Sequence, residues 1–457
     1  MPNDSLLSIS PIDGRYQSKT SSLTDFFSEF ALIKTRVEVE IKWLLFLSKN
    51  KTIKFIPEIS SLQNKKILKI FDDFSLIDAK QIKRIEKTTN HDVKAVELFI
   101  VNKLKKLNIG KLCEFVHFGC TSEDINNLSY ALMLDRYISL KFLTDVSSLQ
   151  KNLTSLAKKW SKISMLAFTH GQPASPTTLG KEFSNYSSRI IFHLKMIKSI
   201  KQRGKFNGAS GNYNAHLIAD KKVNWEKLSK KFVESFKLEF SSHSTQIELK
   251  DAMAAQMANI HNLNNVLIDY AQDVWLLISK NYLKQNLKAG EVGSSTMPHK
   301  VNPIDFENAE GNLSLSNGLL IAIKNKIQIS RLQRDLSDST VLRNIGSIFA
   351  YINIGLKSLE KGTSKIIPNK EIILEDLNNS WEILTEAIQT ILRKNGINDS
   401  YNKIKLSSRG KKLDYHSYIK IIDDLKINKA DKELLYSLTP AKYIGLADKL
   451  AKSSLKS

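Results

Sequence analysis

The sequence has only two cysteines, no long apolar run and no basic leader, and each absence excludes a class of protein. Cys113 and Cys120 have no regularly spaced metal-type ligands around them, and they fit a reducing compartment as buried thiols. No apolar run reaches the roughly 18 residues of a membrane span, and segment 1–4 (MPND) does not begin a cleavable leader. We therefore expect a cytoplasmic protein without a cysteine-based metal site or a membrane partner.

Strand signals are also scarce, and no internal repeat or low-complexity linker appears. Instead, apolar residues recur at three- and four-residue steps, the period of an amphipathic helix. Helices are expected at about 22–45, 59–74, 78–86, 121–162, 177–203, 250–282, 303–324 and 335–361. Long helices without heptad regularity predict an all-α bundle, and their apolar content indicates association between chains.

The net charge of +22 raises nucleic-acid binding as an alternative function. The lysines, however, are spread along all 457 residues among asparagines and isoleucines, and no nucleic-acid motif accompanies them. We expect no specific nucleic-acid partner, although the charge favours salt-sensitive sticking and an anionic substrate. The length predicts two or three domains.

The segment 293–303 (GSSTMPHKVNP) packs flexible, rigid and reactive residues between two helical patterns. Its glycine and two prolines break helices, while serine hydroxyls, a lysine and an asparagine can bind a carboxylate. An ordinary solvent loop has a similar composition, so composition alone leaves both interpretations open.

Two histidines stand in polar turns outside the apolar helix faces. His170 lies in 169–178 (THGQPASPTT), where glycine and prolines break any helix, and His91 lies in 88–97 (TTNHDVKAVE), just before a helical pattern. The segment 117–127 (HFGCTSEDINN) has a similar cap before a helix. Helix capping or a polar surface would explain each segment without a catalytic role.

The 293–303 string resembles the signature loop of the fumarase/aspartase superfamily, whose members eliminate fumarate from a succinyl group. Together with 304–308 (IDFEN) it is most similar to the adenylosuccinate lyase family, and the similarity runs from about residue 10 to 447. The resemblance implies three helical domains at 1–111, 112–364 and 365–457, the central one forming the helical core of a homotetramer. It also implies active sites shared between subunits.

The implied activity is that of a carbon–nitrogen lyase of purine biosynthesis, which releases fumarate from adenylosuccinate to give AMP and from SAICAR to give AICAR. By resemblance Ser294 is the general base and His170 the general acid. The residues that match substrate contacts are Arg15, Tyr16, Thr89, Asn90, His91, Thr121, Ser122, Gln246, Ser295, Lys300, Asn302, Arg334, Ser339, Thr340, Val341, Leu342 and Arg343. Among these, Ser295, Lys300 and Asn302 would hold succinyl carboxylates, and Arg334, Ser339, Thr340 and Arg343 would hold the nucleotide phosphate and ribose. The resemblance implies no metal or organic cofactor.

Two alternatives remain. The first is a sister lyase of the argininosuccinate type. Its amino-acid substrate has no phosphate that the segment 339–343 (STVLR) could bind. A non-catalytic basic scaffold would have no use for His170, Ser294 and Lys300.

Overall fold

The structure is a computed structural model that describes residues 5–286, 297, 300–400, 404 and 413–453. The chain divides into two compact units. The first unit comprises Met1–Asp145, Lys195–Asn264 and Gly311–Lys357, and the second comprises Val146–Leu194, Asn265–Glu310 and Ser358–Ser457. The division into domains 1–111, 112–364 and 365–457 stays a prediction.

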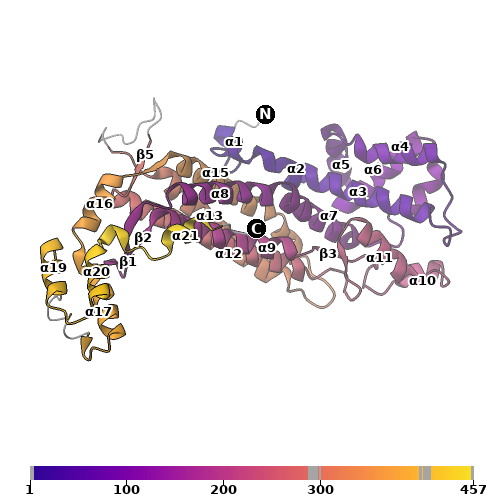
Figure 1. Cartoon of the computed structure of the whole chain (residues 1–457). Helices are drawn as coiled ribbons and strands as arrows, with labels where there is room; N and C mark the ends of the chain where they lie inside the picture. Colours follow the sequence, from indigo (N-terminus) through magenta and orange to yellow (C-terminus); the bar gives the residue numbers. More distant parts are fainter. Residues whose placement is uncertain (1–4, 287–296, 298–299, 401–403, 405–412, 454–457) are drawn as a thin grey trace. The chain divides into compact units, whose positions relative to one another are not determined.

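Helices dominate the structure (Figure 1), which confirms the all-α prediction. The first unit contains α1 (Gln17–Thr20), α2 (Thr24–Phe27), α3 (Glu29–Ser48), α4 (Ser61–Asp72), α5 (Leu76–Thr89), α6 (Asp92–Lys106), α7 (Ser122–Tyr137), α10 (Asn214–Ala219), α11 (Trp225–Ser235) and α14 (Ser337–Leu342). The second contains α16 (Lys370–Asn378), α17 (Thr385–Lys394), α19 (Tyr415–Asp423), α20 (Lys429–Ser437) and α21 (Ala447–Lys452). Residues of both units occur in α8 (Leu143–Lys159), α9 (Leu179–Ser199), α12 (Asp251–Ser279), α13 (Ile304–Ile327) and α15 (Ile345–Lys365).

The long helix expected after residue 121 is present as α7 and α8, joined by a π-helical turn at Ile138–Phe142. Such a turn inserts into a helix without ending it, so the apolar pattern runs through it. The pattern at 335–361 instead contains two helices, because α14 ends at Leu342 and α15 begins at Ile345.

In the described part of the chain, three small two-stranded sheets supplement the helices. Two are antiparallel, β1 (Ser164–Thr169) with β2 (Gln172–Thr178) and β5 (Leu283–Gln285) with β6 (Ile366–Pro368), and β3 (Arg203–Gly204) pairs parallel with β4 (Glu239–Phe240). The β1–β2 hairpin occupies a stretch expected only as a turn. Its prolines are compatible with a strand because a two-stranded sheet has only edge strands.

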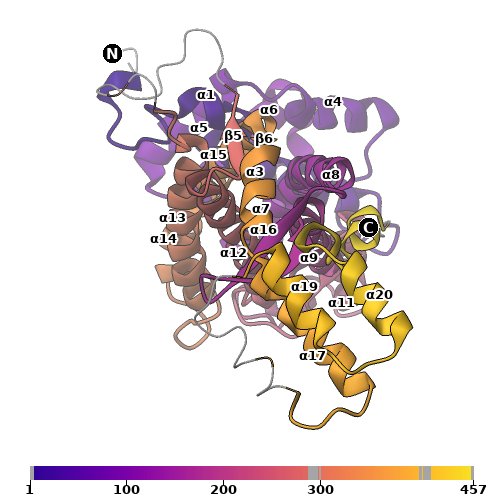
Figure 2. The same ribbon diagram turned by 60° about the vertical axis from the view of Figure 1, so that its left-hand side comes forward.

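The apolar core of the first unit lies among α3, α5, α6 and α7, which run close together in Figure 1. Trp43 of α3 is fully buried, with its ring centroid 4.5 Å from that of Phe206. α3 also buries the charged side chains of Arg36, Glu38 and Glu40. In the second unit α20 contacts α17 and α19 near the C-terminal end (Figure 2).

Candidate active site

Two helices of the first unit begin next to each other, and their first residues hold part of the candidate site. α6 begins after His91, which caps it, and α7 begins after Thr121, whose amide donates to the Asp124 carboxylate over 2.8 Å. Ser122 Oγ lies 3.4 Å from His91 Nε2. The N-terminal ends of helices carry partial positive charge and unpaired amides, so two adjoining ends favour an anion.

The cap on α6 sets the tautomer of His91. The backbone amide of Lys94 donates to His91 Nδ1 over 3.1 Å. A ring nitrogen that accepts a hydrogen bond carries no proton, so in this state Nε2 carries it and donates toward Ser122. His91 is exposed, so its Nε2 side is accessible to a ligand.

Both candidate phosphate-binding arginines adjoin this pair of helix ends. Arg334 Nη1 lies 2.9 Å from Glu123 Oε1, in the first turn of α7. The two terminal nitrogens of Arg343 each lie 3.4 Å from a carboxylate, Nη1 from Glu29 and Nη2 from Asp92. The structure therefore brings Arg334 and Arg343 to the helix starts that hold His91 and Ser122.

Asp92 is the carboxylate at the start of α6. Burial raises its pKa, but the charge of Arg36, the Val93 amide and the charge of Arg343 together lower it below its usual value. Asp92 is consequently ionised at neutral pH, and it holds two guanidinium groups at once.

The carboxylate of Asp335, the residue after Arg334, holds this segment in place by hydrogen bonds. Asp335 accepts hydrogen bonds from the hydroxyl and the amide of Ser337 and from the amide of Arg331, which lowers the pKa of Asp335 to about 2. α14 follows, anchored by an ion pair of 3.2 Å between the buried side chains of Asp338 and Lys250. α14 contains the remaining candidates of this segment, of which Thr340 is exposed, Leu342 is buried, and Ser339 and Val341 are half-buried.

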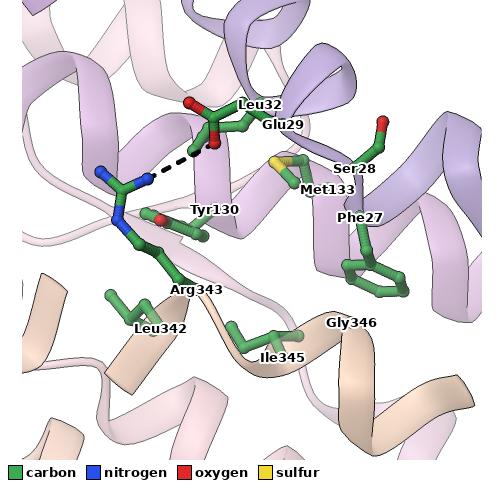
Figure 3. A pocket seen from close by; sticks show the side chains of 10 residues that line it. All are labelled: Phe27, Ser28, Glu29, Leu32, Tyr130, Met133, Leu342, Arg343, Ile345 and Gly346. Atoms are coloured by element: carbon green, nitrogen blue, oxygen red, sulfur yellow. Dashed lines mark hydrogen bonds and ion pairs between the residues drawn. The ribbon is translucent and has the colours of Figure 1, made fainter. Parts of the chain in front are cut away.

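Arg343 stands at the edge of a cavity of about 250 Å³ (Figure 3). Its wall consists of Phe27, Ser28, Glu29, Leu32, Tyr130, Met133, Leu342, Arg343, Ile345 and Gly346. A second cavity of about 500 Å³ also has Arg343 in its wall. The N-terminal arm lines this second cavity with Asp13 and Gln17, the neighbours of Arg15 and Tyr16 in the chain.

Three further candidates lie in the first unit. Thr89 donates its hydroxyl proton to the carbonyl of His91 over 3.2 Å, and Asn90 ends α5 in the left-handed region with φ 50°. Gln246 donates to the carbonyl of Ala209 over 3.1 Å. Thr89 and Asn90 thus directly precede the His91 cap.

His170 belongs to the second unit, at the tip of the β1–β2 hairpin. His170 and Gly171 have φ values of 53° and 73°, and positive values at both central positions give the turn that fits the twist of a two-residue hairpin. The ring is exposed, as the sequence predicted. The hairpin thus holds His170 on a short rigid loop.

Lys300 and Asn302 precede α13 in the second unit, the first exposed and the second half-buried. Lys300 donates its amide proton to the carbonyl of Met297 over 3.0 Å. Ser294 and Ser295 lie outside the described residues.

The sequence reasoning missed four residues behind the two arginines, the charged Glu29, Arg36 and Glu123 and the amide of Asn126, and it considered Asp92 only as a helix cap. The signal in the sequence was the place of Arg36 in α3, three residues after Ile33 and on the helix face that also carries Val37 and Leu44. A charge inside an apolar pattern indicates a buried ionic partner.

Across residues 5–286, 300–400 and 413–453, no three His, Cys, Asp or Glu side chains are grouped so as to hold a metal ion. No helix in the described part of the chain is long and apolar enough to cross a membrane.

Family models match most of the chain. A model described as lyase matches residues 14–315, and a model described as adenylosuccinate lyase C-terminal matches residues 330–444. The chain is 46% identical over 449 residues to adenylosuccinate lyase of Legionella pneumophila (strain Corby), covering 98% of each chain. It is 45% identical over 448 residues to adenylosuccinate lyase of Escherichia coli (strain K12), again covering 98% of each.

Solved structures share the fold at low sequence identity. Fumarate lyase from Mesorhizobium sp. BNC1 has a TM-score of 0.76 at 16% identity, with 94% of this chain and 96% of that chain covered. The 3-carboxy-cis,cis-muconate lactonizing enzyme from Pseudomonas putida has a TM-score of 0.74 at 16% identity, with 95% and 97% covered. These likenesses establish the long-helix fold expected from the sequence.

Proposed function

The chain belongs to the adenylosuccinate lyase family, and from this premise we propose that it releases fumarate from adenylosuccinate to give AMP, and from SAICAR to give AICAR, in purine biosynthesis. The observation that carries the proposal is that Arg334 and Arg343 form ion pairs with carboxylates in the first turns of α7 and α6. Two guanidinium groups and two helix N-terminal ends form a setting for the phosphate of a nucleotide.

The reaction is a β-elimination across a carbon–nitrogen bond. In the proposed step Ser294 takes a proton from the carbon next to a succinyl carboxylate, the carbon–nitrogen bond breaks, and His170 gives a proton to the departing nitrogen. The negative charge that builds on the carboxylate requires nearby donors, which Ser295, Lys300 and Asn302 would supply.

The exposed hairpin tip supports the acid role of His170, because a ring on an exposed two-residue turn is accessible to a substrate. The tautomer of His91 supports a binding role, with Nε2–H as a neutral donor to the substrate. Arg15, Tyr16 and Gln246 are proposed to complete the nucleotide contacts together with Thr89, Asn90, Thr121, Ser122 and residues 339–342.

The proposal includes assembly into a cytoplasmic homotetramer in which neighbouring subunits complete each site. The support for this assembly is the membership of the chain in the family, whose resemblance implies shared sites. If the sites are shared, dissociated monomers lack activity. Sedimentation at decreasing protein concentration, with activity measured in parallel, tests this: activity must fall with the tetramer fraction.

The direct test is incubation of the purified protein with adenylosuccinate, followed by ultraviolet absorbance and chromatography for fumarate and AMP. Argininosuccinate in a parallel sample distinguishes the sister lyase. We expect fumarate from adenylosuccinate alone. Fumarate from argininosuccinate alone would show that the chain is a lyase of the argininosuccinate type. No turnover of either substrate by a folded tetramer would favour a non-catalytic scaffold protein.

A further inference from the structure

We propose that Arg36 is a positioning residue that fixes the two phosphate-binding arginines without touching substrate, and that Asp92 connects Arg36 to Arg343. The inference rests on the proposed function, because it assigns a role to residues behind Arg334 and Arg343. All the residues involved belong to the first unit.

Arg36 is connected to Arg343 through Asp92. Arg36 Nη2 donates to Asp92 Oδ2 over 2.8 Å, and the same oxygen lies 3.4 Å from Arg343 Nη2. A charge-assisted hydrogen bond is about 2.7–2.9 Å at full strength, so Arg36 holds Asp92 firmly and Asp92 holds Arg343 more loosely. Arg343 thus has a fixed reference point and still has N–H groups to offer to a phosphate.

Arg36 is connected to Arg334 through Asn126 and Glu123. Arg36 Nε donates to Asn126 Oδ1 over 2.9 Å, and Asn126 Nδ2 donates to Glu123 Oε1 over 3.0 Å. Glu123 Oε1 in turn lies 2.9 Å from Arg334 Nη1. One guanidinium therefore lies between both candidate phosphate-binding groups.

The position of Arg36 supports this role. Its side chain is 1% exposed, and it is charged at every relevant pH. A buried guanidinium reaches no substrate, and its planar donors act in two fixed directions. Lysine at this position would keep the charge but could not reproduce the two divergent bonds.

The test uses Arg36→Lys and Asp92→Asn, each alone and in an Arg343→Ala background. In the single variants we expect KM for adenylosuccinate to rise about tenfold with kcat nearly unchanged, the pattern of lost substrate binding. In the Arg343→Ala background Asp92→Asn should change KM by less than about twofold, because the group that Asp92 positions is gone. Arg36→Lys should raise KM less in that background than in the wild type, because only its contacts toward Arg334 remain. A purely structural role would not produce this dependence on Arg343.

Glu97→Gln is the matched control. Glu97 lies further along α6 and pairs with Lys94 over 2.6 Å, outside the connected group. It should leave KM unchanged. Should Asp92→Asn fail to assemble, Arg36→Lys, which keeps the buried charge, supplies the same comparison.

The outcomes separate the two proposals. If Arg343→Ala leaves KM unchanged, the phosphate role under the proposed function is refuted for that residue. If Arg343→Ala raises KM but Arg36→Lys or Asp92→Asn has an equal effect in both backgrounds, or none, the positioning role is refuted.

Discussion

A buried ion pair behind the start of α7 offers a sharp test of the stability of the first unit. Lys205 and Asp124 are 2.8 Å apart, and both side chains are 0% exposed. The Asp124 carboxylate also accepts the amide protons of Thr121, Asn207 and Gly208 over 2.8, 3.0 and 3.1 Å. It thereby ties the α7 cap to the 205–208 segment.

The expected cost of Asp124→Asn follows from these contacts. Oδ1 faces Lys205 and Asn207, while Oδ2 faces Thr121 and Gly208. Whichever way the new amide turns, two donors lose an acceptor, and each orphaned buried group costs about 1–3 kcal/mol. The sum of roughly 2–6 kcal/mol agrees with the typical cost of about 3–5 kcal/mol for removing one partner of a buried pair.

Lys205→Met should cost less than Asp124→Asn. The carboxylate loses its ion pair but still accepts three amide protons, and the Gly208 carbonyl, 3.0 Å from the lysine Nζ, loses its donor. Lys230→Gln is the matched control, because Lys230 and Glu234 form an exposed pair at 3.8 Å in the same unit. Exposed pairs contribute at most about 1 kcal/mol, so the control should change little.

Equilibrium urea unfolding followed by tryptophan fluorescence measures the difference. Trp43 and Trp225, both at most 2% exposed, report on the first unit. The predicted order of destabilisation is Asp124→Asn, then Lys205→Met, then Lys230→Gln. An Asp124→Asn variant that loses less than about 1 kcal/mol, or that is more stable than Lys205→Met, would refute the reasoning.

Three further predictions concern single residues. His170→Ala should lower kcat for adenylosuccinate by about 10²–10⁴-fold without changing the melting temperature, and near-normal kcat would remove His170 from proton transfer. Burial lowers the pKa of His216 in the folded protein, so below about pH 6.5 the unfolded state takes up the proton first and stability falls. His216→Phe should therefore lose less unfolding free energy than the wild type between pH 7 and 5, and an equal loss would contradict this. Gly119→Ala should destabilise by roughly 1–3 kcal/mol, because φ is +72° and a Cβ would lie 2.6 Å from His216 Nε2. At Gly110 a Cβ meets nothing within 4 Å, so Gly110→Ala is the control in the same melting experiment.

The apolar period predicted most of the long helices, because their buried faces repeat at helical spacing. α7 with α8, α12 and α13 follow the expected ranges closely. The β1–β2 hairpin was not predicted, because its strands contain prolines and lack a clear alternation of apolar and polar residues.

Part of the candidate site was also predictable. The polar strings around His91 and Ser122 mark the helix starts that the structure brings together. Arg36 escaped notice because its partners come from distant segments, 56 residues away at Asp92 and 90 residues away at Asn126. The local sequence of α3 could indicate a buried charge, but only the fold shows which residues pair with it.

The most direct measurement of the central claim compares adenylosuccinate with its phosphate-free nucleoside as substrates of the wild type and of Arg343→Ala. If Arg334 and Arg343 bind the phosphate, kcat/KM in the wild type should favour the nucleotide by at least about a hundredfold, since their charged groups stay unpaired with the nucleoside. Arg343→Ala should remove much of this preference. Equal kcat/KM for both substrates in the wild type, or an undiminished preference in Arg343→Ala, would contradict the account.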